Sequence, residues 1–292
     1  MSALAITLVI SSAIMHAMRD FFTKKSCDTR SFMWAFSICS VILYLPVFLY
    51  LVSTHGWPAG KGFHIAITAG LVVHFLYWAF LTKAYEQGDL SHVYPIVRSA
   101  PALVLVASIF ILKEEFSSLG IIGILLVVIG AYIINMKKWS VHSFLEPIES
   151  FIYDQTTRFA LVALVMVTAY SLIDSQGVKY IHPIIYLYLV NFFSMIPYTI
   201  YVLSTRSVAT LLNEWKCGKT SIVVNGFFGL MSYGFILIAF TMAQASYVVG
   251  LRQISIVLAV LLGGHMLKEK HKSIRLTSAL IIFTGAFMIS IA

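Results

Sequence analysis

The sequence is poor in charged residues and poor in cysteine. Only 11% of its 292 residues are Asp, Glu, Lys or Arg, whereas 60% are hydrophobic and the mean hydropathy is +0.90. Soluble globular domains carry about 25% charged residues, so this composition excludes an ordinary soluble protein. The three cysteines, Cys27, Cys39 and Cys217, form an odd set without metal-ligand spacing. They therefore indicate neither a disulfide framework nor a metal site.

The chain also lacks the short segments of alternating apolar and polar residues that are typical of a membrane β-barrel. Its hydrophobic residues instead form continuous runs of about 20 residues, the length that an α-helix needs to cross a bilayer. We therefore predict an all-α polytopic membrane protein. Its ten transmembrane helices are expected at residues 3–23, 31–53, 63–85, 91–112, 118–136, 157–178, 183–204, 219–243, 246–267 and 273–291.

The net charge of +8 arises in short loops between the spans, so it indicates orientation and predicts no nucleic-acid partner. Lysine and arginine are concentrated in loops that follow odd-numbered spans, for example at Lys24, Lys25, Lys137 and Lys138. By the positive-inside rule these loops are cytoplasmic and both termini lie outside. We expect a multi-pass protein of a bacterial-type inner (cell) membrane.

The two halves of the chain resemble each other at one constant offset. Ala84 aligns with Ala239, Gly130 with Gly285, and "LKE" at 112–114 with "LKE" at 267–269. We predict a first repeat at 1–136, a linker at 137–156 and a second repeat at 157–292. Each repeat has five spans, an odd number, so the second enters the membrane from the opposite face. Many secondary transporters use such inverted repeats to build one midplane site that opens alternately to each side.

Ionisable residues within the spans are few, and each is costly unless it faces the bundle interior or water. The candidates for a functional site are His16, Asp20, His74, Arg98, Asp174 and Arg252. We predict two inversion-related acid/base sets, Asp20 with Arg98 and Asp174 with Arg252, that hold a solute or act as gates. A purely structural role for each pair stays open. Lys83 and Glu86 lie near a span end and are left out of the predicted site.

Polar-tipped aromatic residues complete the predicted site. Their rings hold small organic solutes by stacking, cation–π contact and hydrogen bonding, although such residues also mark membrane interfaces. The candidates are Tyr77, Trp78, Tyr94, Tyr170, Tyr233 and Tyr247. Pro101 in the fourth span and Gly250 in the ninth predict that these two spans bend or pack closely.

Four segments carry a family resemblance: "MHAMRDFFTKKS" at 15–26, "DLSHVYPIVRSAPALVLV" at 89–106, "AYSLIDSQGVKY" at 169–180 and "ASYVVGLRQISIVLAVLLGGHMLKEK" at 245–270. With these segments the chain resembles, over essentially its whole length, the ten-span EamA-type members of the drug/metabolite transporter superfamily. The resemblance implies transport of a small metabolite, usually without ATP, through a central cavity lined mainly by spans 1, 3, 4, 6, 8 and 9. It implies no particular substrate.

The residues and the resemblance together predict a secondary active transporter. Its partners are expected to be a small-molecule metabolite and the lipid bilayer, and we infer no obligate protein partner. The excess of arginine and histidine favours an anionic or zwitterionic metabolite, such as an amino acid. No cofactor is expected, and proton coupling through a histidine or an aspartate is a hypothesis. The alternatives are a polytopic membrane enzyme and a non-transporting scaffold, but no nucleophile-and-base motif or metal-binding pair favours an enzyme.

Overall fold

The chain folds into a bundle of helices, and in the part described there is no strand. The computed structural model describes residues 1–23, 26–87, 93, 96–133, 154–257 and 272–292, without the side chains of 17–23, 272–273 and 275. Five helices are long and apolar enough to cross a membrane, and five shorter apolar helices occupy the other predicted spans. The predicted fold class is confirmed, and the predicted linker at 137–156 lies almost entirely outside the described residues.

Ten spans are recognisable along the chain, and three of them are built from more than one helical segment. The first repeat contains α1 (Ala3–Thr23), α2 (Thr29–His55), α3 (Gly60–Thr68) with η1 (Ala69–His74) and α4 (Phe75–Gln87), α6 (Ala100–Ala107) with η2 (Ser108–Leu112), and α7 (Ser118–Ile133). The second contains α9 (Gln155–Gly177), α10 (Pro183–Thr205), α11 (Val208–Phe240), α12 (Ala245–Leu251), which continues as an apolar helix to Val257, and α14 (Lys272–Ile291).

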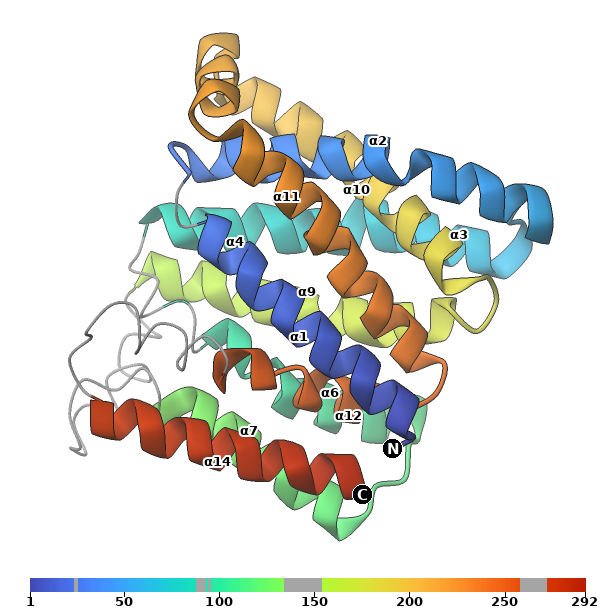
Figure 1. Ribbon diagram of the computed structural model, residues 1–292, viewed down its shortest axis with the longest axis vertical. Helices are drawn as coiled ribbons and strands as arrows, with labels where there is room; N and C mark the ends of the chain where they lie inside the picture. Colours follow the sequence, from blue (N-terminus) through green and yellow to red (C-terminus); the bar gives the residue numbers. More distant parts are fainter. Residues whose placement is uncertain (24–25, 88–92, 94–95, 134–153, 258–271) are drawn as a thin grey trace.

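The packing of the helices follows the inverted repeat. α1, the first span, packs on α11, the eighth. Their repeat equivalents, the sixth span (α9) and the third (α4), pack on each other in the same way. Three further pairs join a span to its own equivalent in the other repeat: α2 with α10, α6 with α12 and α7 with α14. Figure 1 shows α7 and α14 side by side at one edge of the bundle and α1 lying along α11.

Glycines allow α7 and α14 to approach closely. A Cβ atom at Gly123 would lie 2.8 Å from the carbonyl oxygen of Gly285, and one at Gly285 would lie 2.5 Å from that of Gly123. Gly130, the repeat equivalent of Gly285, lies against Ile282 on the same interface. In a lipid bilayer the hydrophobic effect does not favour helix–helix contact, so small residues stabilise such contacts by allowing close van der Waals packing.

The eighth span differs from the prediction at its start. We expected residues 205–218 to form a loop, but α11 begins at Val208, where the Ser207 side chain accepts a hydrogen bond from the Thr210 N–H. The helix is kinked at Gly218, whose φ of −140° and ψ of 28° are not helical. Glu214, on the segment before the kink, accepts hydrogen bonds from the backbone N–H groups of Cys27 and Asp28. These bonds tie the extra helical turns to the start of α2.

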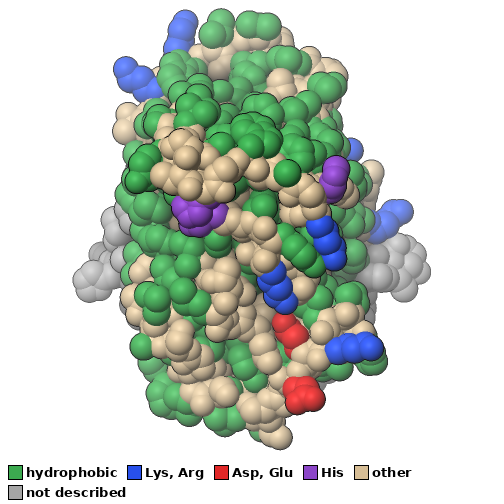
Figure 2. Space-filling view, turned by 90° about the vertical axis from the view of Figure 1, so that its right-hand side faces the viewer, with side chains coloured by type: hydrophobic (Ala, Val, Ile, Leu, Met, Phe, Trp, Pro, Cys, Tyr) green, Lys and Arg blue, Asp and Glu red, His purple; other side chains and the backbone are tan. Residues whose placement is uncertain are grey.

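The two ends of the chain meet at one end of the bundle. The N-terminal ammonium of Met1 donates to the carbonyl of Ser290 at 3.3 Å, as an even number of spans allows. Figure 2 looks onto this end, where Lys, Arg, Asp, Glu and His side chains are sparse and hydrophobic side chains flank them on both sides. The charged groups visible on this face therefore lie at the ends of the helices.

Candidate functional site

The fourth and ninth spans are both interrupted beside their arginines. In the fourth span Ser99 has a φ of −76° and a ψ of 0°, and Pro101 stands at the beginning of α6. In the ninth, α12 ends at Leu251, and the N–H of Ser255 donates to the Arg252 carbonyl at 3.1 Å in a tighter turn. Pro101 and Gly250 were the sequence signals for these bends. Both interruptions leave polar groups near the middle of the bundle.

Arg98 and Gln253 meet where α6 and α12 cross. The Arg98 guanidinium donates to the Gln253 side-chain oxygen at 3.3 Å, and the Gln253 amide donates to the Arg98 carbonyl at 3.3 Å. The two residues are 155 positions apart, which is the offset of the repeat. Residues that contact their own equivalents lie on the pseudo-two-fold axis, so this pair marks the axis that relates the two halves.

A basic cluster surrounds His16 beside this axis. One ring nitrogen of His16, Nε2, lies 3.0 Å from a guanidinium nitrogen of Arg98, and the other, Nδ1, lies 3.4 Å from one of Arg252. His16 is only 6% exposed. The Nε atom of Arg252 is buried and has no hydrogen-bond partner within the part of the chain that the structure describes. We call His16, Arg98, Arg252 and Gln253 the basic cluster; in it, one arginine from each repeat lies beside the His16 imidazole.

An acid cluster surrounds Asp174 on α9, which has no exposed surface. Its Oδ2 atom lies 2.9 Å from Nε2 of His74 and accepts a short hydrogen bond from the Tyr233 hydroxyl. Its Oδ1 atom accepts from the Tyr186 hydroxyl at 2.7 Å. We call these four residues the acid cluster. Three donors around one buried carboxylate provide the hydrogen bonds that make such burial tolerable.

His74 reaches Asp174 from a π-helical turn. Residues Ala69–His74 form η1 in the middle of the third span, and His74 is its last residue. Gly70 makes room for this wider turn against α10, because a Cβ there would lie 2.7 Å from the Val190 carbonyl. Single π turns inside α-helices are frequent at functional sites, since they redirect the side chains that follow.

Aromatic rings line the acid cluster. The Tyr170 ring stacks on the His74 ring with centroids 4.4 Å apart, and it meets the rings of Tyr77 and Tyr233 edge-on at 5.1 Å and 5.9 Å. Tyr233 also links the two clusters. Its hydroxyl donates to Asp174, while the guanidinium carbon of Arg252 lies 5.8 Å from its ring centroid. Tyr233 is therefore in contact with both the Asp174 carboxylate and the Arg252 guanidinium.

The structure brings together most of the predicted site residues but not in the predicted pairs. The expected ion pair of Asp174 with Arg252 is wrong, because Asp174 is paired with His74 and Tyr233 lies between the two charges. The side chain of Asp20 and all of Tyr94 lie outside the described residues. The pairing of Asp20 with Arg98 therefore stays a prediction.

Two predicted aromatic residues lie apart from the clusters. Tyr247 packs edge-on against Phe116 with centroids 5.4 Å apart, and its hydroxyl accepts from the Ser117 N–H at 3.3 Å near a loop. Trp78 contacts Tyr77 but packs on Phe36 of α2 as well. A pattern of tyrosine and tryptophan along a helix does not tell which ring faces the interior.

Tyr186 and Gln253 belong to the clusters and were not predicted. Nothing in the sequence distinguishes Tyr186 from the other tyrosines of its span. Gln253 did carry a signal, because the repeat aligns it with Arg98. No group of three metal-ligating side chains occurs in the described part of the chain.

A second unpredicted feature is a group of ion pairs at the end of the bundle opposite the two chain termini. Arg206 donates to both carboxyl oxygens of Asp28, at 3.2 and 3.0 Å, and to Glu86 at 2.7 Å. Arg30 also donates to Glu86 and, at 2.9 Å, to the Thr205 hydroxyl. We call Asp28, Arg30, Glu86 and Arg206 the ionic end. It joins α2 and α4 of the first repeat to α10 of the second.

The charge of Asp28 is favoured at this end. Burial by itself raises the pKa of its carboxyl, but hydrogen bonds from Ser31 and the ion pair with Arg206 outweigh burial and lower the pKa. From the sequence, Glu86 was expected only to lie at the membrane interface. In the structure it is one of the two carboxylates of this network between the repeats.

The comparison with known proteins agrees with this geometry. The EamA-like transporter family matches residues 3–136 and again residues 158–291, so both five-span halves are covered. The chain belongs to the EamA-like transporter family. This family consists of membrane transporters, and the chain is accordingly an integral, multi-pass membrane protein of the drug/metabolite transporter type.

Two further similarities are informative about the EamA-like fold. A protein of known crystal structure superposes with a TM-score of 0.71 at 12% sequence identity, covering 100% of this chain and 98% of its own. That likeness shows the fold alone. An uncharacterized protein of Methanocaldococcus jannaschii is 29% identical over 136 residues, which are 46% of this chain and 98% of that protein. Its length therefore corresponds to about one half of this chain.

Proposed function

We propose that this protein is a secondary active transporter, in a bacterial-type cell membrane, for a small anionic or zwitterionic metabolite such as an amino acid. The observation that carries the proposal is the basic cluster. Arg98 and Arg252, from inversion-related breaks in the fourth and ninth spans, converge on His16 beside the pseudo-two-fold axis. A site on this axis is the place that both repeats alternately expose.

The chemistry of the basic cluster favours a carboxylate or a similar anion. Arginine presents a planar fork of donors that matches carboxylate oxygens, and such charge-assisted hydrogen bonds are the strongest in proteins. The buried Nε of Arg252 is a donor that no described residue satisfies, at a cost that an incoming acceptor removes. The Tyr233 ring, whose centroid lies 5.8 Å from the Arg252 guanidinium carbon, is available for the organic part of the solute, and Tyr170 packs edge-on against it.

The acid cluster supports a proton-coupled cycle. Asp174 and His74 share one hydrogen bond inside the bundle, and a proton bound there changes the number of charges that the bilayer interior must hold. Tyr233 connects that pair to Arg252, so protonation of Asp174 weakens its hold on the Tyr233 hydroxyl and frees the ring that faces the arginine. Solute binding at the basic cluster and proton binding at the acid cluster are thereby linked.

The ionic end supplies a gate for alternating access. The ion pairs of Arg206 with Asp28 and Glu86 join the two repeats at one face, and they must separate if that face opens. The Asp28, Glu86 and Arg206 side chains keep 25% of their surface exposed, so water replaces these ion pairs more readily than it replaces fully buried ones. The gate therefore holds the repeats together without preventing their movement.

The test is transport by purified protein in liposomes. Counterflow of labelled acidic, zwitterionic and cationic amino acids identifies the class of solute, and uptake with and without a pH gradient tests the coupling. We expect counterflow of an acidic or zwitterionic solute that is driven further by a proton gradient. Chemical conversion of the solute would instead indicate an enzyme, and absence of counterflow across a broad metabolite panel would indicate a scaffold.

A further inference from the structure

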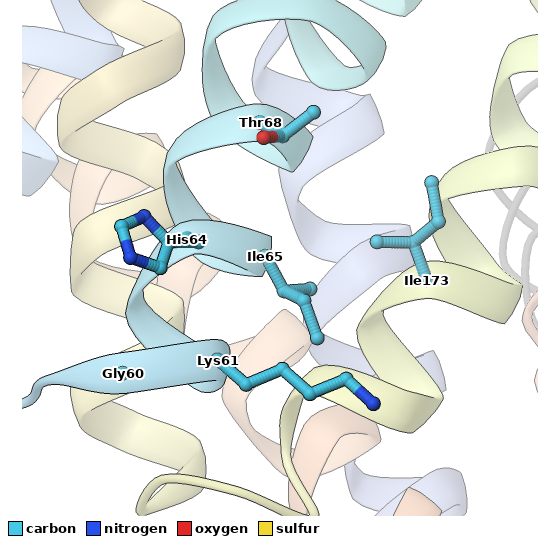
Figure 3. A pocket seen from close by; sticks show the side chains of 6 residues that line it. All are labelled: Gly60, Lys61, His64, Ile65, Thr68 and Ile173. Carbon is cyan, nitrogen blue, oxygen red and sulfur yellow. The ribbon is translucent and has the colours of Figure 1, made fainter.

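A groove lies on the outer side of the bundle between α3 and α9. It has a volume of about 580 Å³ and is lined by Gly60, Lys61, His64, Ile65, Thr68 and Ile173. In Figure 3 the side chains of Ile65 and Ile173 face each other across the gap, and the Lys61 side chain extends along one end of it toward α9. The groove therefore has an apolar middle and a cationic end.

The groove faces the bilayer and is separate from the acid cluster. Lys61, His64 and Thr68 form an exposed stripe with helical spacing along α3. On α9, Ile173 is partly exposed, whereas the next residue, Asp174, is completely buried in the acid cluster. Adjacent positions on a helix point about 100° apart. The wall of the groove and the candidate site thus lie on different sides of α9.

The cationic end lies at the depth of the lipid headgroups. The Lys61 ammonium donates to the Tyr180 hydroxyl at 2.9 Å and lies 4.8 Å from the Tyr180 ring centroid. Tyr180 is 50% exposed and Trp57, in the preceding loop, is 66% exposed. Exposed tyrosine and tryptophan at the ends of spans mark the interface between acyl chains and headgroups.

The charges around this end select an anionic ligand. None of the groove's lining residues is acidic, and among the described residues the hydrogen-bonding partner of Lys61 is a neutral hydroxyl. The neighbouring Lys179 is bonded to Gln176 at 3.0 Å and lies near the carboxyl of Glu114, so Lys61 is the cation that the groove itself supplies.

We propose that this groove binds one anionic phospholipid, with an acyl chain against Ile65 and Ile173 and the phosphate at Lys61. An apolar groove open to the bilayer is filled by an acyl chain, and a basic residue at the interface attracts anionic headgroups. The site adjoins a functional element, because α3 continues directly into η1, the π-helical turn that ends at His74. A lipid seated on α3 supports the turn that presents His74 to Asp174.

The experiment measures thermal unfolding and lipid retention of the purified full-length protein. Phosphatidylglycerol and phosphatidylcholine with identical acyl chains are added to the detergent-solubilised protein, and native mass spectrometry counts the lipids that remain bound. We expect phosphatidylglycerol to bind more tightly and to raise the unfolding temperature more. The variant Lys61→Gln should weaken phosphatidylglycerol binding about fivefold, and Lys219→Gln, an exposed lysine elsewhere on the chain, should not.

A second variant keeps the test independent of the lysine. Ile65→Trp fills the middle of the groove and should displace both lipids while Lys61 remains. Equal binding of the two lipids to the unmodified protein, or an undiminished preference in Lys61→Gln, would overturn the proposal. Stabilisation by glycerol phosphate alone, equal to that by phosphatidylglycerol, would also overturn it, because it would indicate a soluble anion and not a lipid.

Discussion

The acid cluster and the basic cluster differ in how well the protein satisfies them. Asp174 has a partner for each carboxyl oxygen, from three different helical elements, and is closed to solvent. In the basic cluster, two guanidinium groups meet one imidazole, and the buried Nε of Arg252 has no hydrogen-bond partner among the described residues. The enclosed acid cluster leaves room for nothing larger than a proton. The Nε of Arg252 suits a solute that brings its own acceptor.

The largest effect should come from breaking the acid cluster at Asp174. Asp174→Ala leaves His74, Tyr186 and Tyr233 without their acceptor, and losing one member of a buried charged set costs about 3 kcal/mol or more. Asp174→Asn keeps a side-chain oxygen and the shape. We expect Asp174→Asn to remain folded, to lose the response of uptake to a pH gradient and to retain counterflow.

Thermal unfolding and proteoliposome uptake separate these two outcomes. An Asp174→Asn variant whose uptake responds to a pH gradient as strongly as the unmodified protein would show that the proton is carried elsewhere.

Breaking the basic cluster should have the next largest effect. Arg252→Gln and Arg98→Gln each remove a charge-assisted hydrogen bond, and we expect the apparent affinity for an anionic solute to fall about tenfold to a hundredfold. The stability of the fold should change little, because neither arginine supports the acid cluster directly. Counterflow measured over a range of solute concentrations checks this prediction. Arg158→Gln, an exposed arginine at the start of α9, is the matched control.

The link between the clusters is tested at Tyr233. Tyr233→Phe removes the hydroxyl that donates to Asp174 but keeps the ring that faces Arg252. The loss of a hydrogen bond to a charged group is worth about 1.5 kcal/mol, so the pH-gradient response should weaken about tenfold while solute affinity is nearly unchanged. Tyr247→Phe, in a tyrosine that lies apart from the clusters, should alter neither quantity. Equal losses of coupling and of affinity in Tyr233→Phe would show that the two clusters are one site.

The smallest effect is expected at the ionic end, which neither cluster contacts. Arg206→Gln removes the partner of Asp28 and one partner of Glu86, and partly exposed ion pairs contribute about 1 kcal/mol or less. The lowered pKa of Asp28 means that its stabilisation is present at neutral pH and is lost as the pH falls below the ordinary value of 3.8. Unfolding temperatures of the variant and the unmodified protein should therefore differ slightly at neutral pH and converge in acid.

The sequence predicted the arrangement of spans well because hydrophobic length and the repeat are properties of the chain itself. Pro101 and Gly250 predicted that the fourth and ninth spans bend or pack closely, and the structure interrupts both spans. The repeat aligned Arg98 with Gln253, which the structure places in contact. The pairing of charges was less predictable. Which face of α9 meets which face of the third span depends on packing, so the sequence predicted Arg252 as the partner of Asp174 where the structure has His74.

Local backbone geometry accounts for the rest. The π-helical turn Ala69–His74 adds a residue to one turn and so rotates His74 relative to an ideal helix, which no hydrophobic pattern reveals. The helical segment before Gly218 was also missed, because its polar residues resemble a loop until Glu214 is seen to bind the start of α2.

The central claim, that the basic cluster binds the negative group of a transported solute, is tested most directly by one measurement. Counterflow of acidic, zwitterionic and cationic amino acids is compared between the unmodified protein, Arg252→Gln and Arg158→Gln in otherwise identical liposomes. The account predicts that an acidic or zwitterionic solute is transported and that Arg252→Gln alone loses it. Preferential transport of the cationic solute, or full activity of Arg252→Gln at low solute concentration, would contradict the account.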